Sequence, residues 1–307
     1  MNRTIEKPRF LCAFPGTGVA FCGKEYAFYK KHIEKFERLF AYVTPIAGIT
    51  PNDVFDASKE FHSELNSQLI TYLYSCAMWD VVREVVEPVA VTGYSMGIYA
   101  ALYAAGVITF KQGVGIISRA LHHMEEIASR DSYGMLAIVG LCRQECLDII
   151  GKHSPCEVML VNQNNQTSFV FSGLADKLEK CARIANDRGA YKTVMLPVKI
   201  PYHHPVLKGA SVRMYKEIGD NRWRRANLPV VSAINRCMVL GSGELKKLVA
   251  ENLSTPINWY TVIESIQENC YGIIECGPGI SLTQMGRFIL PGKPYVNVKN
   301  IGRRLGV

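Results

Sequence analysis

The sequence predicts an α/β protein with a mostly parallel sheet that helices cover on both faces. Short apolar runs of strand length alternate with longer segments whose apolar residues recur at helical spacing. Strand-like runs end in glycine-rich loops at residues 15–18 and 277–279. The 307 residues, 48% hydrophobic and 20% charged, are enough to bury one large core or two smaller ones.

The first part of the chain alternates strands and helices. Residues 9–14 are expected to form a buried strand that runs into the first glycine-rich loop. A short strand over 89–92 follows Pro88, which ends the preceding helix because proline disfavours a helical residue before it. Helices are predicted over residues 31–42, 63–86, 96–105 and 111–129.

The pattern changes after residue 130. Strands are predicted over 134–141, 158–161, 168–172 and 192–198, and helices over 144–152 and 175–188. The order strand, helix, strand, strand, helix, strand is the ferredoxin-like pattern. We therefore expect residues 131–199 to form a small ferredoxin-like subdomain inserted in a large α/β unit of residues 1–130 and 200–307.

The large unit resumes after Pro201. A helix is predicted over 211–218, a strand over 229–234, and helices over 245–252 and 260–269. A strand over 272–276 leads into the second glycine-rich loop, and a further helix starts at Ser281. Strands separated by helices in this way favour a parallel sheet.

Composition excludes several classes of function. The net charge of +8 is modest, the densest basic run (222–225) is short, and no zinc-finger or RNA-binding signature is present, so nucleic acid is not expected as a partner. The ten cysteines are scattered and predict reduced thiols, with no metal site. No uninterrupted apolar run is long enough for a membrane span, and the N-terminus lacks signal-peptide architecture. We expect a cytoplasmic protein without a metal or redox cofactor.

The pentapeptide Gly93-Tyr94-Ser95-Met96-Gly97 has the G-x-S-x-G pattern of a nucleophile elbow. It follows a predicted strand and precedes a predicted helix, which is the context that the pattern requires. The turn strains the serine backbone, and side chains at the glycine positions would collide with the strand and helix. The alternative is an ordinary serine that caps a buried helix.

A serine nucleophile needs a general base. Of the seven histidines, His32, His62 and His153 lie in polar contexts, and His122 and His123 lie on a predicted helix. His203 and His204 lie between Pro201 and Pro205 in a loop that follows a strand, which suits a catalytic histidine. Position alone leaves the choice between these two open.

Seven segments together resemble the malonyl-CoA:acyl carrier protein transacylases and the acyltransferase domains of polyketide synthases. The similarity covers nearly the whole chain. The matches are F-P-G-T-G (14–18) to F-P-G-Q-G, G-Y-S-M-G (93–97) to G-H-S-L-G, A-G-V-I (105–108) to the A-A-G segment, N-Q-N (162–164) to N-x-N, L-P-V (196–198) through His203 to the catalytic-histidine segment, P-I-N-W (256–259) to P-V-x-W, and E-C-G-P-G (275–279) to E-x-G-P-G.

The resemblance implies a fold, a mechanism and site residues. It implies an α/β-hydrolase-like large subdomain and a ferredoxin-like small one, and it selects His203 as the base for Ser95. The implied oxyanion donors are the backbone N–H groups of Thr17 and Met96, and the backbone carbonyl of Asn252 is implied to orient the histidine. An acyl-serine would pass its acyl group to the phosphopantetheine thiol of an acyl carrier protein.

The sequence departs from the family pattern around the implied acyl pocket. Thr17 replaces the family's glutamine, Tyr94 its histidine, and the bulky Tyr202 precedes the catalytic histidine. Malonyl-specific members carry an arginine that pairs with the malonyl carboxylate, and counting without gaps from Ser95 places Ala120 there. Arg119 is one residue earlier, about 100° around a helix, and is expected to point elsewhere. The acyl pocket is expected to contain Tyr94, Arg119, Ala120, Tyr202, Gln68 and Asn162.

Several functions remain open at this stage. The leading hypothesis is a monomeric acyltransferase that takes a non-malonyl acyl group from coenzyme A or a carrier protein, in fatty acid, polyketide or related biosynthesis. The alternatives are an acyl hydrolase that clears carrier proteins, a plain esterase, and a non-catalytic docking module. Carrier proteins are acidic, so the net charge of +8 would favour their approach, with Arg222, Arg224 and Arg225 as a docking patch or an ordinary basic loop.

Overall fold

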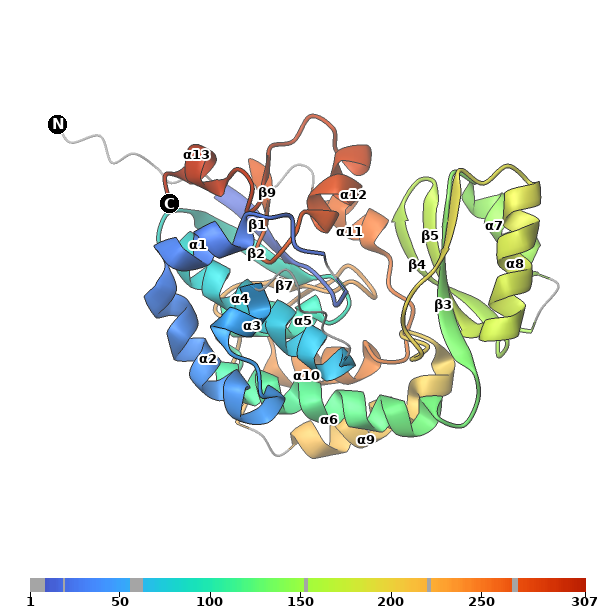
Figure 1. Ribbon diagram of the computed structural model, residues 1–307, viewed down its shortest axis with the longest axis horizontal. Coiled ribbons are helices and arrows are strands. Elements are labelled where there is room, and N and C mark those ends of the chain that lie inside the picture. Colours follow the sequence, from blue (N-terminus) through green and yellow to red (C-terminus); the bar gives the residue numbers. More distant parts are fainter. Residues whose placement is uncertain (1–8, 19, 56–62, 152–153, 220–221, 267–269) are drawn as a thin grey trace.

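The structure is a computed structural model that describes residues 9–18, 20–55, 63–151, 154–219, 222–266 and 270–307. Figure 1 shows a large unit that contains both ends of the chain and a smaller unit beside it. The prediction of a parallel-sheet α/β unit with a smaller antiparallel unit is confirmed.

A six-stranded sheet forms the centre of the large unit, in the order β10-β9-β1-β2-β7-β8. All adjacent pairs are parallel except β7 with β8. Central strands β1 and β2 pair from Arg9 opposite Glu87 to Phe14 opposite Gly93, so both strands end at the same edge. The strands are β1 (Arg9–Phe14), β2 (Glu87–Gly93), β7 (Val230–Val231), β8 (Met238–Val239), β9 (Gly272–Glu275) and β10 (Tyr295–Val296).

Side chains of β1 alternate between two cores, one on each face of this sheet. Phe10, Cys12 and Phe14 pack into the larger core, and Leu11 and Ala13 pack into the smaller core on the other face. The helices of the larger core are α1 (Glu25–Lys31), α2 (Ile33–Ala47), α3 (Pro51–Phe55), α4 (Glu64–Val82), α5 (Gly97–Ala104), α6 (Phe110–Ala128), α9 (Lys208–Gly219), α10 (Ser242–Glu251) and α13 (Ile301–Leu305). The opposite core is formed with α11 (Trp259–Ser265) and α12 (Ser281–Ile289).

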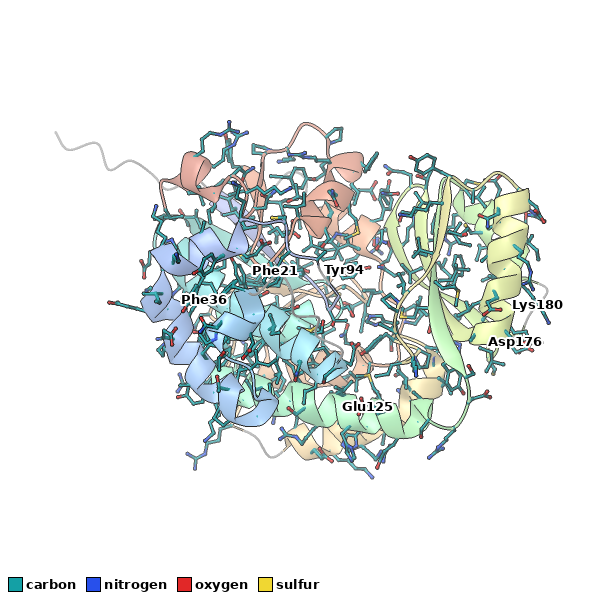
Figure 2. All side chains as sticks on the ribbon, viewed as in Figure 1. Phe21, Phe36, Tyr94, Glu125, Asp176 and Lys180 are labelled. Atoms are coloured by element: carbon teal, nitrogen blue, oxygen red, sulfur yellow. The ribbon has the colours of Figure 1, made fainter. Side chains whose placement is uncertain are left out.

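The small unit has an antiparallel sheet in the order β4-β5-β3-β6, and all its strands fall between residues 133 and 195. In chain order its strands and helices follow the ferredoxin-like pattern. Helices α7 and α8 pack against the sheet through buried side chains, Cys146 and Ile149 of α7 and Leu178 and Cys181 of α8. The elements are β3 (Tyr133–Val139), α7 (Arg143–Ile150), β4 (Val158–Asn165), β5 (Ser168–Leu174), α8 (Ala175–Asp187) and β6 (Lys192–Met195). In Figure 2, Asp176 and Lys180 lie on the outer side of this unit, and Tyr94 lies near the middle of the molecule.

Several element boundaries differ from the sequence prediction. The helix predicted over 31–42 is α2, which starts at Ile33 and extends to Ala47, and the separate helix α1, which ends at Lys31, was not predicted. The strand predicted over 229–234 is only two residues long, because the Ser232 hydroxyl accepts the N–H groups of Ile234 and Asn235 and turns the chain. The strand predicted over 192–198 ends at Met195, two residues before Pro197.

The described residues include neither a membrane-spanning helix nor a cluster of metal-binding side chains. In that part of the chain no helix is both long enough and apolar enough to cross a bilayer. The same residues include no group of three or more histidine, cysteine, aspartate or glutamate side chains that could hold a metal ion. All ten cysteines are free thiols, and six of them are buried: Cys12, Cys76, Cys146, Cys181, Cys270 and Cys276.

Candidate active site

Ser95 occupies a strained turn between β2 and α5. Its φ of 54° lies in the left-handed region that residues other than glycine rarely adopt. A Cβ at Gly93 would lie 2.1 Å from the amide nitrogen of Ile98, and one at Gly97 would lie 2.1 Å from the carbonyl oxygen of Phe14. Only glycine fits at these two positions, as the nucleophile-elbow pattern requires.

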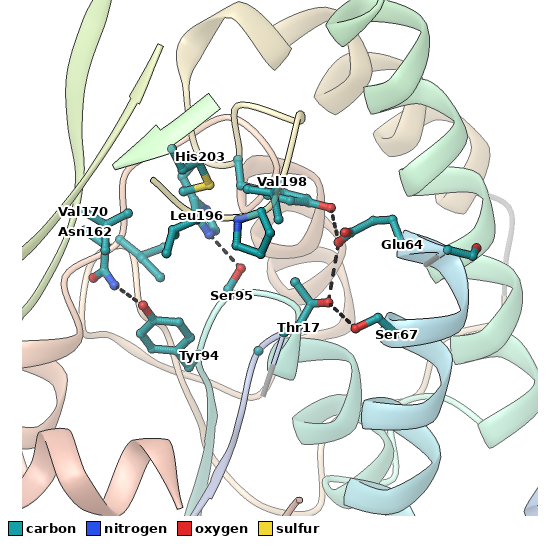
Figure 3. Close-up of a pocket in the computed structure, with 17 residues that line it drawn as sticks. Thr17, Glu64, Ser67, Tyr94, Ser95, Asn162, Val170, Leu196, Val198 and His203 are labelled. Carbon is teal, nitrogen blue, oxygen red and sulfur yellow. Dashed lines mark hydrogen bonds between the residues drawn. The ribbon is translucent and has the colours of Figure 1, made fainter. Parts of the chain in front are cut away.

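The nucleophile and a histidine are in direct contact. Ser95 Oγ lies 2.8 Å from His203 Nε2 (Figure 3). His203 itself has a φ of 63°, and its amide donates a hydrogen bond to the carbonyl of Leu253, which fixes the loop. The neighbouring His204 is used differently: Nε2 lies 3.1 Å from the carbonyl oxygen of Pro155, and Nδ1 accepts the N–H of Val206. The geometry therefore brings His203, and not His204, to the serine.

The environment of His203 favours the neutral imidazole, the form that can act as a base. Burial lowers its pKa to about 4, although the backbone carbonyls of Asn252 and Thr255 favour the protonated ring. Nδ1 has no partner within strict hydrogen-bond geometry among the described residues, so these carbonyls act at longer range. The predicted orienting role of the Asn252 carbonyl stays a prediction. The Asn252 side chain has another contact, in which its amide donates to the carbonyl oxygen of Ser95 at 3.1 Å.

Two backbone N–H groups next to Ser95 are free to bind an oxyanion. Neither the amide of Thr17 nor that of Met96 donates a hydrogen bond to a described residue. Met96 is also the N-cap of α5, where free N–H groups and the helix dipole favour negative charge. This arrangement is compatible with the predicted oxyanion hole.

A cavity of about 520 Å³ opens over Ser95 and His203, between the two units. Its large-unit wall comes from the 16–18 loop and the start of α4, and its small-unit wall comes from the sheet and the segment after β6. Apolar side chains line the small-unit side. They are Met135, Val170, Leu196, Pro197 and Val198, joined by Ile257 of the large unit.

The α4 side of the cavity contains a polar network centred on Glu64 (Figure 3). Tyr202 Oη donates to Glu64 Oε1 at 2.7 Å, and Gln68 Nε2 lies 3.1 Å from the same oxygen and 2.9 Å from Tyr202 Oη. Thr17 Oγ1 lies 3.5 Å from Glu64 Oε1 and 3.4 Å from Ser67 Oγ. Tyr202 thus lines the cavity, whereas Gln68, which was also expected in the acyl pocket, is buried and does not line it.

Tyr94 connects the nucleophile elbow to the small sheet. Its hydroxyl accepts from Asn162 Nδ2 at 2.7 Å and donates to Asn164 Oδ1 at 2.9 Å. Burial raises the pKa of the Tyr94 hydroxyl to about 12, so it stays neutral. The ring of Tyr94 also packs edge-on against Trp259. Tyr94 and Asn162, both predicted pocket residues, line the cavity.

Neither Arg119 nor Ala120, both named for the acyl pocket, lines the cavity, and Arg119 points elsewhere, as its position on the helix predicts. Ala120 is 1% exposed and packs in the core beneath α6. Arg119 points across to α9, where Nε lies 3.5 Å from Glu217 Oε2. Helix α6 is continuous through these positions, so no local irregularity turns Arg119 toward Ser95.

Sequence reasoning missed Glu64 and Ser67, which also line the cavity. Both lie at the start of a long helix whose pattern predicts burial and gives no indication of a site. The catalytic pair, by contrast, is preceded by recognisable local motifs. Only the packing of α4 against the 16–18 loop and Tyr202 brings Glu64 into the cavity.

Comparisons with known proteins agree with the motifs. No protein-family model matches the chain. The chain is 26% identical over 311 residues to the malonyl CoA-acyl carrier protein transacylase of Bacillus subtilis, covering 98% of this chain and 92% of that protein. It is 28% identical over 207 residues to the polyketide biosynthesis protein ThaF of Burkholderia thailandensis, covering 67% of this chain but 18% of that protein.

Solved structures show the same fold. The acyl-carrier-protein S-malonyltransferase of Burkholderia pseudomallei superposes with a TM-score of 0.87 at 24% identity over 97% of this chain and 100% of that one. A malonyl-transacylase solved in complex with a type II polyketide synthase acyl carrier protein gives a TM-score of 0.82 at 23% identity, over 94% and 95% of the chains. The resemblance to the malonyl-CoA:acyl carrier protein transacylases is confirmed at low identity.

Proposed function

We propose that the chain is a serine-dependent acyltransferase that moves an acyl group from a thioester to the thiol of an acyl carrier protein. The observation that carries this proposal is the 2.8 Å contact between Ser95 Oγ and His203 Nε2 at the base of the cavity. The relatives named above, which include a transacylase bound to its carrier protein, support the class of reaction and the partner.

The proposed first half-reaction forms an acyl-serine. His203 Nε2 takes the proton of Ser95 Oγ as the oxygen attacks the thioester carbonyl. The N–H groups of Thr17 and Met96 stabilise the resulting oxyanion. When the tetrahedral intermediate collapses, the C–S bond breaks, the thiolate takes the proton from His203, and an ester of Ser95 remains.

The proposed second half-reaction reverses these steps with a different thiol. The phosphopantetheine thiol of the carrier protein gives its proton to His203 and attacks the acyl-serine carbonyl. Collapse then breaks the ester C–O bond, and Ser95 Oγ recovers the proton. The same base and oxyanion donors serve both halves, so no further acid–base residue is needed.

We propose further that the acyl group is not malonyl. A carboxylate in a cavity needs a cation or several hydrogen-bond donors. Among the described residues, no lysine or arginine lines the cavity, and Arg119 is paired with Glu217 instead.

The test is intact-mass analysis after incubation with a panel of acyl-CoA thioesters, followed by a chase with holo-carrier protein or with buffer alone. We expect one acyl adduct on the wild-type chain, none on Ser95→Ala, and transfer to the carrier protein that is faster than release to water. Rapid release of the acyl group to water without carrier protein would refute the transferase proposal and indicate an acyl hydrolase.

A matched pair of histidine variants sharpens this test. His203→Asn removes the base and should slow adduct formation by about 10²-fold or more. His204→Asn changes the adjacent buried imidazole, which contacts the backbone and not the serine, and should leave adduct formation within a few-fold of wild type. Equal losses in both variants would refute the assignment of His203 as the base.

A further inference from the structure

The cavity contains an acidic side chain that the proposed mechanism does not use. Glu64 lies at the first turn of α4 and is partly exposed to the cavity. Its three hydrogen-bond partners, Tyr202, Gln68 and Thr17, all contact Oε1. No described residue donates a hydrogen bond to Oε2, so this oxygen can accept hydrogen bonds from a bound ligand.

The surroundings of Glu64 do not neutralise it. Its described partners are a phenol, an amide and a hydroxyl, and within the described part of the chain no lysine or arginine forms an ion pair with it. The phenol of Tyr202 stays a neutral donor, because burial and then the charge of Glu64 raise its pKa well above the ordinary value. Among the described residues, the α4 side of the cavity therefore presents a carboxylate with no cation paired to it.

Tyr202 connects this charge to the reaction centre. It is the residue directly before His203, so the carboxylate is hydrogen-bonded to the side chain next to the general base. Thr17, whose backbone N–H is a proposed oxyanion donor, contacts the same carboxylate with its side chain. An acyl group bound on Ser95 and extending along this wall would have Glu64 beside its far end (Figure 3).

We infer that Glu64 determines acyl specificity: it rejects acyl groups with a distal carboxylate and selects acyl groups whose far end carries an O–H or N–H donor. Two carboxylates at close range in a partly desolvated cavity repel each other, whereas a hydroxyl or ammonium donates to the free lone pairs of Oε2. This inference rests on the proposed function, since it concerns the acyl group that Ser95 would accept.

A purely structural role for Glu64 is the alternative. A carboxylate in the first turn of a helix stabilises the helix dipole, and Glu64 also holds Tyr202 in place. That role would change the stability of the protein, and with it the loading of every acyl group alike. Selectivity among acyl groups is therefore the readout that separates the two roles.

The test uses the full chain and four coenzyme A thioesters of similar length: malonyl, butyryl, 3-hydroxypropionyl and β-alanyl. Rates of adduct formation on Ser95 are compared for wild type, Glu64→Gln and Glu264→Gln. The glutamine keeps an oxygen that can accept from Tyr202 and removes the charge. Glu264 is the matched control, because it also accepts a tyrosine hydroxyl, that of Tyr260 at 3.0 Å, but lies outside the cavity.

For wild type we expect malonyl to load at least about tenfold more slowly than butyryl, and the two donor-bearing groups to load faster than butyryl. Glu64→Gln should raise the malonyl-to-butyryl ratio by about tenfold or more and reduce the advantage of β-alanyl, whereas Glu264→Gln should change neither ratio.

Three results would overturn the inference: wild type that prefers malonyl, a malonyl-to-butyryl ratio that Glu64→Gln leaves within about twofold, or donor-bearing groups that load no faster than butyryl. If none of the four thioesters loads Ser95 of wild type, the proposed function fails, and the inference fails with it. Loading without the expected selectivity refutes the role of Glu64 alone.

Discussion

The burial of His203 predicts an unusual pH profile for acylation of Ser95. The imidazole must be neutral to accept the serine proton, and burial lowers its pKa to about 4 from the usual 6.5. At pH 5.5 a histidine of ordinary pKa would be only about one-tenth neutral, whereas this one would be almost fully neutral. The acylation rate at pH 5.5 should therefore be about tenfold higher than an exposed histidine would allow.

The measurement is the single-turnover rate of adduct formation from an uncharged acyl-CoA between pH 8 and about pH 3.5, below the pKa of His203. We expect a flat profile down to about pH 5 and a half-point near 4. Circular dichroism at each pH checks that the chain stays folded. Glu64→Gln should give the same half-point, which excludes titration of that carboxylate as the cause. A half-point near 6.5 would refute the conclusion that burial keeps His203 neutral.

The same pKa shift predicts a loss of stability in acid. Below pH 6.5 the unfolded chain binds a proton at His203, whereas the folded chain does not bind it until about pH 4. The unfolded state binds more protons across this window, so the contribution of His203 to stability is complete above pH 6.5 and is lost as the pH falls toward 4. The full shift corresponds to roughly 3 kcal/mol. Urea unfolding of His203→Asn and wild type at pH 7 and pH 5 should show a smaller acid loss in the variant.

Two further substitutions test the structural basis of the site. Gly97→Ala would place a Cβ 2.1 Å from a main-chain oxygen of β1 and should lower the free energy of unfolding by about 3 kcal/mol or more. The control is Gly243→Ala on helix α10, where a Cβ would have nothing within 4 Å, so this change should be neutral or stabilising. Urea unfolding measures both variants. Tyr94→Phe removes the hydroxyl between Asn162 and Asn164 and should cost about 1–3 kcal/mol, and an unchanged midpoint of thermal unfolding would contradict that role.

The sequence predicts best what short segments determine by themselves. The strand, the glycines and the serine of the elbow are contiguous, and the steric need for Gly93 and Gly97 follows from that turn alone. The alternation of strands and helices similarly predicts both sheets, because each element has its own periodicity. The short edge strands β8 and β10 have two residues each, too few for any periodicity to be detected.

The cavity wall could not be predicted in the same way, because it is assembled from distant segments. Thr17, Glu64 and Tyr202 are far apart in the chain; the family resemblance alone brings Thr17 and Tyr202 to the site, and Glu64 has no local signal of its own. The choice between His203 and His204 is similar: the two are adjacent in sequence, and only the loop conformation, with a φ of 63° at His203, sends one ring to Ser95 and the other to Pro155.

The sequence and the structure direct attention to the charge of the cavity through different residues. Counting from Ser95 places Ala120 at the pocket and turns Arg119 about 100° away from it; in the structure Ala120 lies in the core and Arg119 pairs with Glu217. Among the described residues that line the cavity, the acidic side chain is Glu64, which lies on a different helix, α4. Loss of an arginine alone would leave a permissive pocket, in which malonyl binds weakly and neutral groups bind no better. A carboxylate in the pocket would repel acyl groups that themselves carry a carboxylate. A pocket that only lacks a cation would not repel them, so only the added carboxylate discriminates against this class of substrate.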